Sequence, residues 1–183
     1  DFVEFRSFFI FDVTLLTAPI QSGTLKLFQE SYFSSVEQET VTIRAAATPV
    51  EDFQNPLPSL DLGQSIFDDL GEGEIYGQGT ITAAPTTTFA GTLIQEFLDI
   101  PLNEAAIRAI NEAREGAGFF SFGVSLSSLN QTPYNDFFLG MDNGGAEGVT
   151  FSSGLPPQDQ PAILIVLEAA PTEPDSELPR RVP

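Results

Sequence analysis

The chain has 183 residues, 17 of them Phe and none of them Trp, Cys or His, and its 26 acidic and 7 basic side chains leave a formal net charge of -19. A field of that sign repels phosphate backbones and anionic lipid headgroups, which argues against nucleic acid and a bare membrane surface as partners. Without Cys or His there is no disulfide frame, thiolate metal site or imidazole for acid–base chemistry near neutral pH. No apolar run is long enough to cross a bilayer, so direct membrane insertion is not expected.

The first predicted element is a strand over residues 5–13, FRSFFIFDV. A strand turns successive side chains to opposite faces, and both faces of this segment carry apolar groups. One face has Phe5, Phe9, Phe11 and Val13, and the other has Arg6, Phe8, Ile10 and Asp12. We expect a core strand that is covered on both faces.

Two further segments alternate in the same way. SGTLKLFQE places Leu25 and Leu27 on one face, and ETVTIRAAA does so with Val41 and Ile43. Their opposite faces carry Thr24, Lys26 and Phe28 in the first segment and Thr42 and Arg44 in the second. Both patterns predict half-solvated antiparallel strands.

Residues 48–79 are rich in Pro, Gly and acid, which predicts long connections with a short helical turn near Ser65 to Leu70. One helix is expected over residues 103–115, because Asn103 suits an N-cap and Gly116 or Gly118 suits the C-terminal stop. Its apolar positions repeat at three- and four-residue spacing and are Ala106, Ile107, Ile110 and Ala113.

Later strands are expected in TITAAPTTTFAGTL, QEFLDIPL, GFFSFGVSLSS, DFFLGM and AILIVLE. In the third of these, the inward side chains are Phe120, Phe122, Val124 and Leu126. About eight to ten short strands with turn-rich connections predict an all-β, antiparallel, jelly-roll-like sandwich over residues 1–168, with the helix across an opening. Residues 169–183 read as a Pro-rich acidic C-terminal tail or arm.

The order of these features resembles secreted bacterial and archaeal β-sandwich modules of the DNRLRE, or disaggregatase-related, type. RSFFIFDVTLLTAPIQSGTLKLF is similar to their opening, and FLDIPLNEAAIRAINEAREGAGFFSFGVSL is similar to their strand, helix and strand passage. FSSGLPPQDQPAILIVLE is similar to the closing strand, and cyanobacterial and proteobacterial exported proteins share an FFVFDLS-like opening. The positions that match the opening are Arg6, Phe11, Asp12, Ser22, Thr24, Leu25, Lys26, Leu27 and Phe28.

The resemblance covers about four fifths of the chain, mostly through core patterning. It implies an extracellular or cell-surface location and a non-catalytic module attached to polysaccharide-active, surface or matrix proteins. Two departures stand out. Only Asp1 to Glu4 precede Phe5 where the family has a further strand, and the end of the chain has no hydrophobic sorting segment.

An enzyme is not expected. Glycoside hydrolysis needs a protonated and an ionised carboxyl group a few ångströms apart, and Asp68, Asp69, Glu72 and Glu74 could supply such a pair. In so acidic a chain such a coincidence is common, and a solvated acidic loop is the preferred explanation. A uronate lyase would have only Tyr32, Tyr76 and Tyr134 as phenols, and no His.

Ca²⁺ is a candidate stabiliser, because hard cations take carboxylate and carbonyl oxygens from turn-rich loops. GMDNGGAEG offers Asp142, Asn143 and Glu147, and FDDLGEGE offers Asp68, Asp69 and Glu72. Neither segment matches an EF-hand. Two acidic hairpin loops are the alternative interpretation.

Two non-catalytic functions remain open. A polysaccharide-binding module would need flat aromatic platforms, which a chain without Trp supplies poorly. The alternative is self-association, or association with another matrix protein, in which a neighbour's strand or tail pairs with an unpaired sheet edge and makes a filament, sheath or matrix. The candidate assembly residues lie at both ends of the chain and are Phe5, Phe8, Ile10, Pro171, Leu178, Arg180 and Arg181.

Overall fold

The computed structural model describes residues 6–33, 37–55, 57–82, 92–126, 136–138, 147–150 and 163–171. Its strands are β1 (Ser7–Asp12), β2 (Ile20–Phe33), β3 (Gln38–Ala45), β4 (Ile75–Thr82), β5 (Thr92–Pro101), β6 (Phe119–Leu126), β7 (Asp136–Phe138), β8 (Glu147–Thr150) and β9 (Ile163–Ala169). Its helices are α1 (Val50–Phe53), α2 (Leu60–Glu72) and α3 (Glu104–Glu115).

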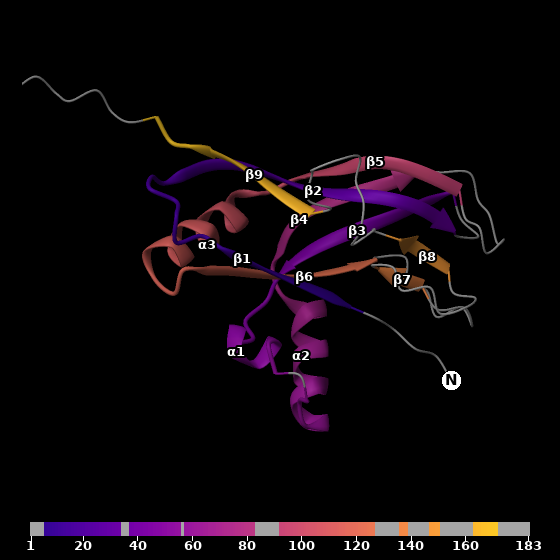
Figure 1. The fold of residues 1–183 in the computed structure, drawn as a ribbon, viewed down its shortest axis with the longest axis horizontal. Helices are drawn as coiled ribbons and strands as arrows, with labels where there is room; N and C mark the ends of the chain where they lie inside the picture. Colours follow the sequence, from indigo (N-terminus) through magenta and orange to yellow (C-terminus); the bar gives the residue numbers. More distant parts are fainter. Residues whose placement is uncertain are drawn as a thin grey trace, which may run out of the picture.

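The strands form two sheets that face each other (Figure 1). Sheet A has the order β1-β6-β3-β4, and all its neighbours are antiparallel. Sheet B has the order β5-β2-β8-β7, and β9 pairs antiparallel with the first half of β2. Within the described residues, β7 and β8 pair in parallel and every other pair is antiparallel. The predicted antiparallel sandwich of about eight to ten strands is confirmed.

The core lies between the two sheets. The alternating positions that the sequence turns inward on β2, β3 and β6 are all buried, and Phe122 is fully enclosed among them. Phe122 also lies 5.5 Å from the ring of Phe9 and 5.8 Å from that of Phe11, centroid to centroid. The inward faces of these strands follow the period of two that a half-buried strand imposes.

The outward faces of the two middle strands are only partly solvated: Thr24, Lys26 and Arg44 are half-buried, and two other residues are buried. Phe28 is 4% exposed on the outward face of β2, where its ring meets Phe97 edge-on at 5.4 Å. Thr42 is 1% exposed on the outward face of β3, and its hydroxyl accepts a hydrogen bond from Gln78. Alternation within one strand does not show whether another element covers the polar face.

Helices α1 and α2 lie on the side of sheet A that faces away from sheet B (Figure 1). There the ring of Phe8 stacks on Phe53 of α1 at 4.4 Å. The guanidinium of Arg6 lies 4.1 Å from the ring centroid of Phe67 and donates to the Phe67 carbonyl at 2.7 Å. Both faces of β1 therefore have packing partners, but Phe8 remains 39% exposed and β1 lies at the edge of sheet A, so the strand is less enclosed than predicted.

The sequence underestimated the helix content of residues 48–79. Where one short helical turn near Ser65 to Leu70 was expected, α2 has 13 residues, and the Ser59 side chain caps its start by accepting from Leu62 N–H at 3.2 Å. The acids and glycines of this segment obscured a helix that packs Leu70 against sheet A, where Gly123 leaves it room. The expectation of a single helix in the chain was wrong.

The sequence also assigned residues 75–79 to a connection, but they belong to β4. Gly77 and Gly79, which look like turn signals, let β4 approach β5 of the other sheet. A Cβ atom on Gly77 would lie 2.7 Å from the Pro101 carbonyl oxygen, and one on Gly79 would lie 2.8 Å from Ile100 Cγ1. A glycine inside a strand commonly marks such a close approach, and here it closes one side of the sandwich.

Helix α3 fills one end of the space between the sheets, beside β2 and β6 (Figure 1). Asn103 caps it as predicted, accepting from Ala106 N–H at 3.1 Å, and Gly118, at φ 79°, donates its N–H to the Ala113 carbonyl. Ala105, Ala106 and Ile110 are buried against the core. The prediction of a helix across an opening is confirmed.

Gly77→Ala should lower the free energy of unfolding by about 1–3 kcal/mol, because its methyl group overlaps a backbone carbonyl that cannot move aside easily. The matched control is Gly63→Ala on α2, where a Cβ atom meets nothing within 4 Å. The control should stabilise by about 0.5–1 kcal/mol through helix propensity. Urea unfolding of both variants gives the comparison, and equal effects would contradict the closure of β4 on β5.

Candidate functional site

The acids proposed for catalysis or Ca²⁺ on α2 do not point to one centre. Both carboxylate oxygens of Asp69 accept hydrogen bonds from the segment after β3, from Ala47 N–H at 3.1 Å, Thr48 N–H at 2.8 Å and the Thr48 hydroxyl at 2.6 Å. Asp68 accepts from the Gln64 side chain at 2.9 Å, and Glu72 is exposed. Asp69 thus anchors α2 to the chain before α1.

Within the described residues, no three acids come close enough to hold a metal ion. Of the second proposed Ca²⁺ set, Asp142 and Asn143 lie outside those residues. Glu147 begins β8, opposite Asp136 of β7, in a segment that the sequence assigned to a loop. Binding of Ca²⁺ stays a prediction.

The Tyr76 phenol packs in the core. Its ring stacks on Phe120 at 5.7 Å, and the residue is 8% exposed. Burial raises the pKa of Tyr76, the charges of Glu74 and Glu112 raise it further, and Arg108 partly opposes them. A phenol held in its protonated form is a poor general base at neutral pH.

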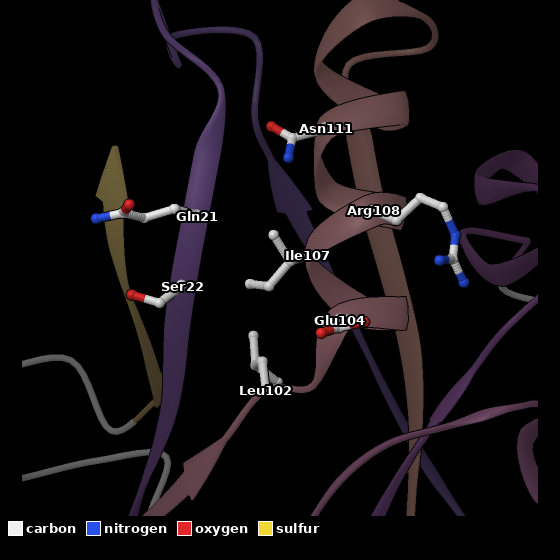
Figure 2. A pocket seen from close by; sticks show the side chains of 7 residues that line it. All are labelled: Gln21, Ser22, Leu102, Glu104, Ile107, Arg108 and Asn111. Atoms are coloured by element: carbon white, nitrogen blue, oxygen red, sulfur yellow. The ribbon is translucent and has the colours of Figure 1, made fainter. Parts of the chain in front are cut away.

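A shallow cavity of about 310 Å³ lies between β2 and α3. Figure 2 shows Leu102 and Ile107 pointing into this space, whereas Gln21 and Arg108 point away from it. The polar groups therefore do not converge on a common ligand position, and no aromatic ring lines the cavity. A sugar ring would find no flat apolar platform here.

Asn111, at the upper end of this cavity in Figure 2, has a structural task. Its side-chain oxygen accepts from Ile20 N–H at 2.8 Å, and its amide nitrogen donates to the Ile20 carbonyl at 2.9 Å. The side chain thereby satisfies both backbone groups at the start of β2, as a neighbouring strand would. It joins α3 to sheet B.

The best candidate for an interaction site is the side of the sandwich opposite β4 and β5. There β1 is the edge strand of sheet A, β9 and β7 lie along the edge of sheet B, and among the described strands β1 pairs only with β6 and β9 only with β2. An antiparallel strand with one partner turns every second N–H and C=O outward. Both edges therefore present hydrogen-bonding groups that a further strand can use.

Strand β9 is held firmly at this edge. Its side chains alternate, so that Ile165 and Leu167 pack against the core while Val166 remains 45% exposed on the outward face. The Glu168 carboxylate accepts from the Ser22 hydroxyl at 2.5 Å, and just beyond the strand Ala170 N–H donates to the Pro19 carbonyl at 2.8 Å. The edge is a fixed surface.

The candidate assembly residues fall partly at this side. Phe8 and Ile10 lie on β1, on the face toward α1 and α2, and Pro171 is exposed two residues after β9. Phe5, Leu178, Arg180 and Arg181 lie outside the described residues. The sequence reasoning missed Val166 as an edge residue, although its signal was the short apolar run AILIVLE without a Lys or Pro.

No protein-family model, curated protein or solved structure matches this chain. The resemblance to DNRLRE or disaggregatase-related modules stays a prediction. Among the described helices, none has the length and apolar character that crossing a bilayer requires.

Asn111→Ala should lower the free energy of unfolding by about 1–3 kcal/mol, because it leaves two part-buried backbone groups of Ile20 without partners. The control is Glu112→Gln, at the next and exposed position of α3, which should change stability by less than about 0.5 kcal/mol. Thermal unfolding measures both. A loss no greater than that of the control would show that the two hydrogen bonds carry no stability.

The turn after β1 should be sensitive to acid. The Thr14 hydroxyl and Thr14 N–H both donate to Asp12, at 2.6 and 2.9 Å, and these bonds lower the pKa of the Asp12 carboxyl. A lowered pKa means that the carboxylate stabilises the turn above its ordinary pKa, and that this contribution is lost as the pH falls through the lowered value.

We expect an NMR titration of the Asp12 carboxyl carbon to show the lowered pKa, and Thr14→Ala to raise it toward the ordinary value. Thr14→Ser keeps both donors and should leave the pKa low. An unchanged titration in the Thr14→Ala protein would contradict the assignment of the shift to Thr14.

Proposed function

We propose that this protein is a non-catalytic, structural or adhesive β-sandwich that acts outside the cell as a subunit of a surface filament, sheath or matrix. The observation that carries the proposal is the outer edge of β9, which pairs with none of the described strands and whose Val166 is 45% exposed. Neighbouring subunits, or a strand of another matrix protein, would add to this edge by β-addition. The extracellular location depends on the resemblance of the opening segment to exported modules.

The described chemistry supports a binding role over catalysis. The carboxylate of Asp69 is taken up by backbone hydrogen bonds, and the Tyr76 phenol keeps its proton in a packed environment. The cavity beside α3 lacks converging polar groups (Figure 2). A polysaccharide-binding function finds no comparable support in this cavity, so it enters as an outcome of the test below.

The charge of the subunit sets how assembly should depend on salt. At a net charge of -19, subunits repel one another, and the repulsion is screened over about 10 Å at 0.1 M ionic strength. Salt should therefore favour assembly, because it screens this repulsion. An interface held by opposite charges would show the reverse dependence on salt. Ca²⁺ should also favour assembly if it binds the acidic loops.

Light scattering on the purified chain should show a mass that rises with protein concentration and with added NaCl, and electron microscopy should show polymers at high concentration. The same series with a chelator tests the contribution of Ca²⁺. A monomer at every concentration that binds glycans on an array would favour the polysaccharide-binding alternative. Turnover of a polysaccharide that is abolished by Asp68→Asn or Glu72→Gln would overturn the non-catalytic assignment.

A further inference from the structure

We infer that the partner of the β9 edge is β9 of a second copy of this chain, paired antiparallel about a two-fold axis at Val166. The inference rests on the proposed function, because it names the surface through which two subunits meet. It makes sheet B continuous across the pair.

The backbone groups along the outer edge of β9 indicate that its partner is another extended strand. Beyond β2, a row of outward N–H and C=O groups runs along the seven residues of β9, and another extended backbone satisfies such a row completely. Natural edge strands commonly carry a Lys, a Pro or a bulge that prevents such pairing. The sequence ILIVLEA has neither Lys nor Pro, and the irregularity in its pairing with β2 lies at its end, between Ile20 and Ser22.

The low density of charge on β9 is compatible with the approach of a second copy. Two chains at -19 can approach closely only where acids are sparse, and β9 has one acid in seven residues. By contrast, α2 carries Asp61, Asp68, Asp69 and Glu72. Like-charge repulsion between copies is therefore weaker along β9 than along α2.

The register follows from the length of the strand. Val166 is the central residue of Ile163–Ala169, so a two-fold axis there pairs all seven residues of both copies. Each Glu168 then lies opposite position 164 of the other copy, and the two Glu168 positions are separated by four residues, or about 13 Å along the strand. The two Val166 side chains become direct neighbours on the outward face, and positions 165 and 167 meet on the inward face.

This arrangement is isologous, with the same patch on both subunits, as in most homodimers. One strand pair buries less surface than a standard interface, so the association should be weak and depend on concentration. A filament would then need a second contact elsewhere on the chain.

Cysteine cross-linking tests the register directly, because the chain has no Cys of its own. Directly opposite residues of antiparallel strands have Cα atoms about 4.5–5.5 Å apart, within the range of a disulfide. Under mild oxidation Val166→Cys should give a covalent dimer, whereas Glu168→Cys, on the same face of the same strand, should remain largely monomeric. Equal cross-linking of the two variants, or none in either, would overturn the register.

Charge substitution tests the pairing without oxidation. Val166→Glu and Val166→Lys should each weaken dimer formation about tenfold or more, because like charges then lie opposite each other at the axis. An equimolar mixture of the two should restore it. Ile75→Glu, on β4 and exposed to 37% where Val166 is exposed to 45%, should leave association unchanged, and circular dichroism checks that all variants fold.

The outcomes separate this inference from the proposed function. If the chain associates in light scattering but the Val166 variants behave as the parent does, the subunits meet elsewhere and only the β9 pairing fails. If the parent chain is monomeric at every concentration and salt, both fail.

Discussion

The structure depends on the close contact between β4 and β5 at Gly77 and Gly79. Without side chains at these positions, the backbone of sheet A comes within van der Waals contact of Ile100 and Pro101 of sheet B. At one end of the sandwich a helix about 10 Å across, α3, lies between β2 and β6. The two sheets therefore close at one edge through glycine, and elsewhere a helix and large side chains fill the space between them.

This asymmetry explains how so acidic a chain accommodates the apolar segment of residues 5–13. Strand β1 lies at the side away from the glycine contact, with Phe9 and Phe11 turned to the core and Phe8 turned to Phe53. On the face toward α2, the Arg6 guanidinium lies over the ring of Phe67. It also lies beside Gly71, and a Cβ atom on Gly71 would collide with it. Most apolar side chains of the segment pack within the molecule, on two faces, while Phe8 stays 39% exposed. The acids lie on strands as well as on helices, and Glu39 of β3 is buried, at 3% exposure.

The same asymmetry leaves β9 as the part of the described fold that favours association. Its inward residues take part in the core and its C-terminal end is hydrogen-bonded to Ser22 and Pro19, yet its outer edge pairs with none of the described strands. A structural subunit needs such a surface to be rigid and sparsely charged, because ordering a flexible segment on binding costs entropy and like charges repel. An active site would need converging polar groups, and neither the acids of α2 nor the cavity beside α3 supplies them.

Side-chain alternation along the sequence was sufficient to predict the β-sandwich and the inward residues of β2, β3 and β6, because it depends only on local periodicity. Three- and four-residue spacing together with a capping residue was sufficient for the helix that begins after Asn103, because a cap forms local backbone hydrogen bonds. Neither pattern was sufficient for α2, whose acids and glycines obscure the period, or for β4, where Gly77 and Gly79 look like turn signals until Ile100 and Pro101 are seen against them. The position of Val166 on a strand with a single described partner, and the role of Asn111 at Ile20, were also decided only by tertiary structure. Asn111 and Ile20 lie far apart in the chain, so no local pattern shows that they meet. Which strand lies at an edge depends on the order of strands in a sheet, which no local pattern encodes either.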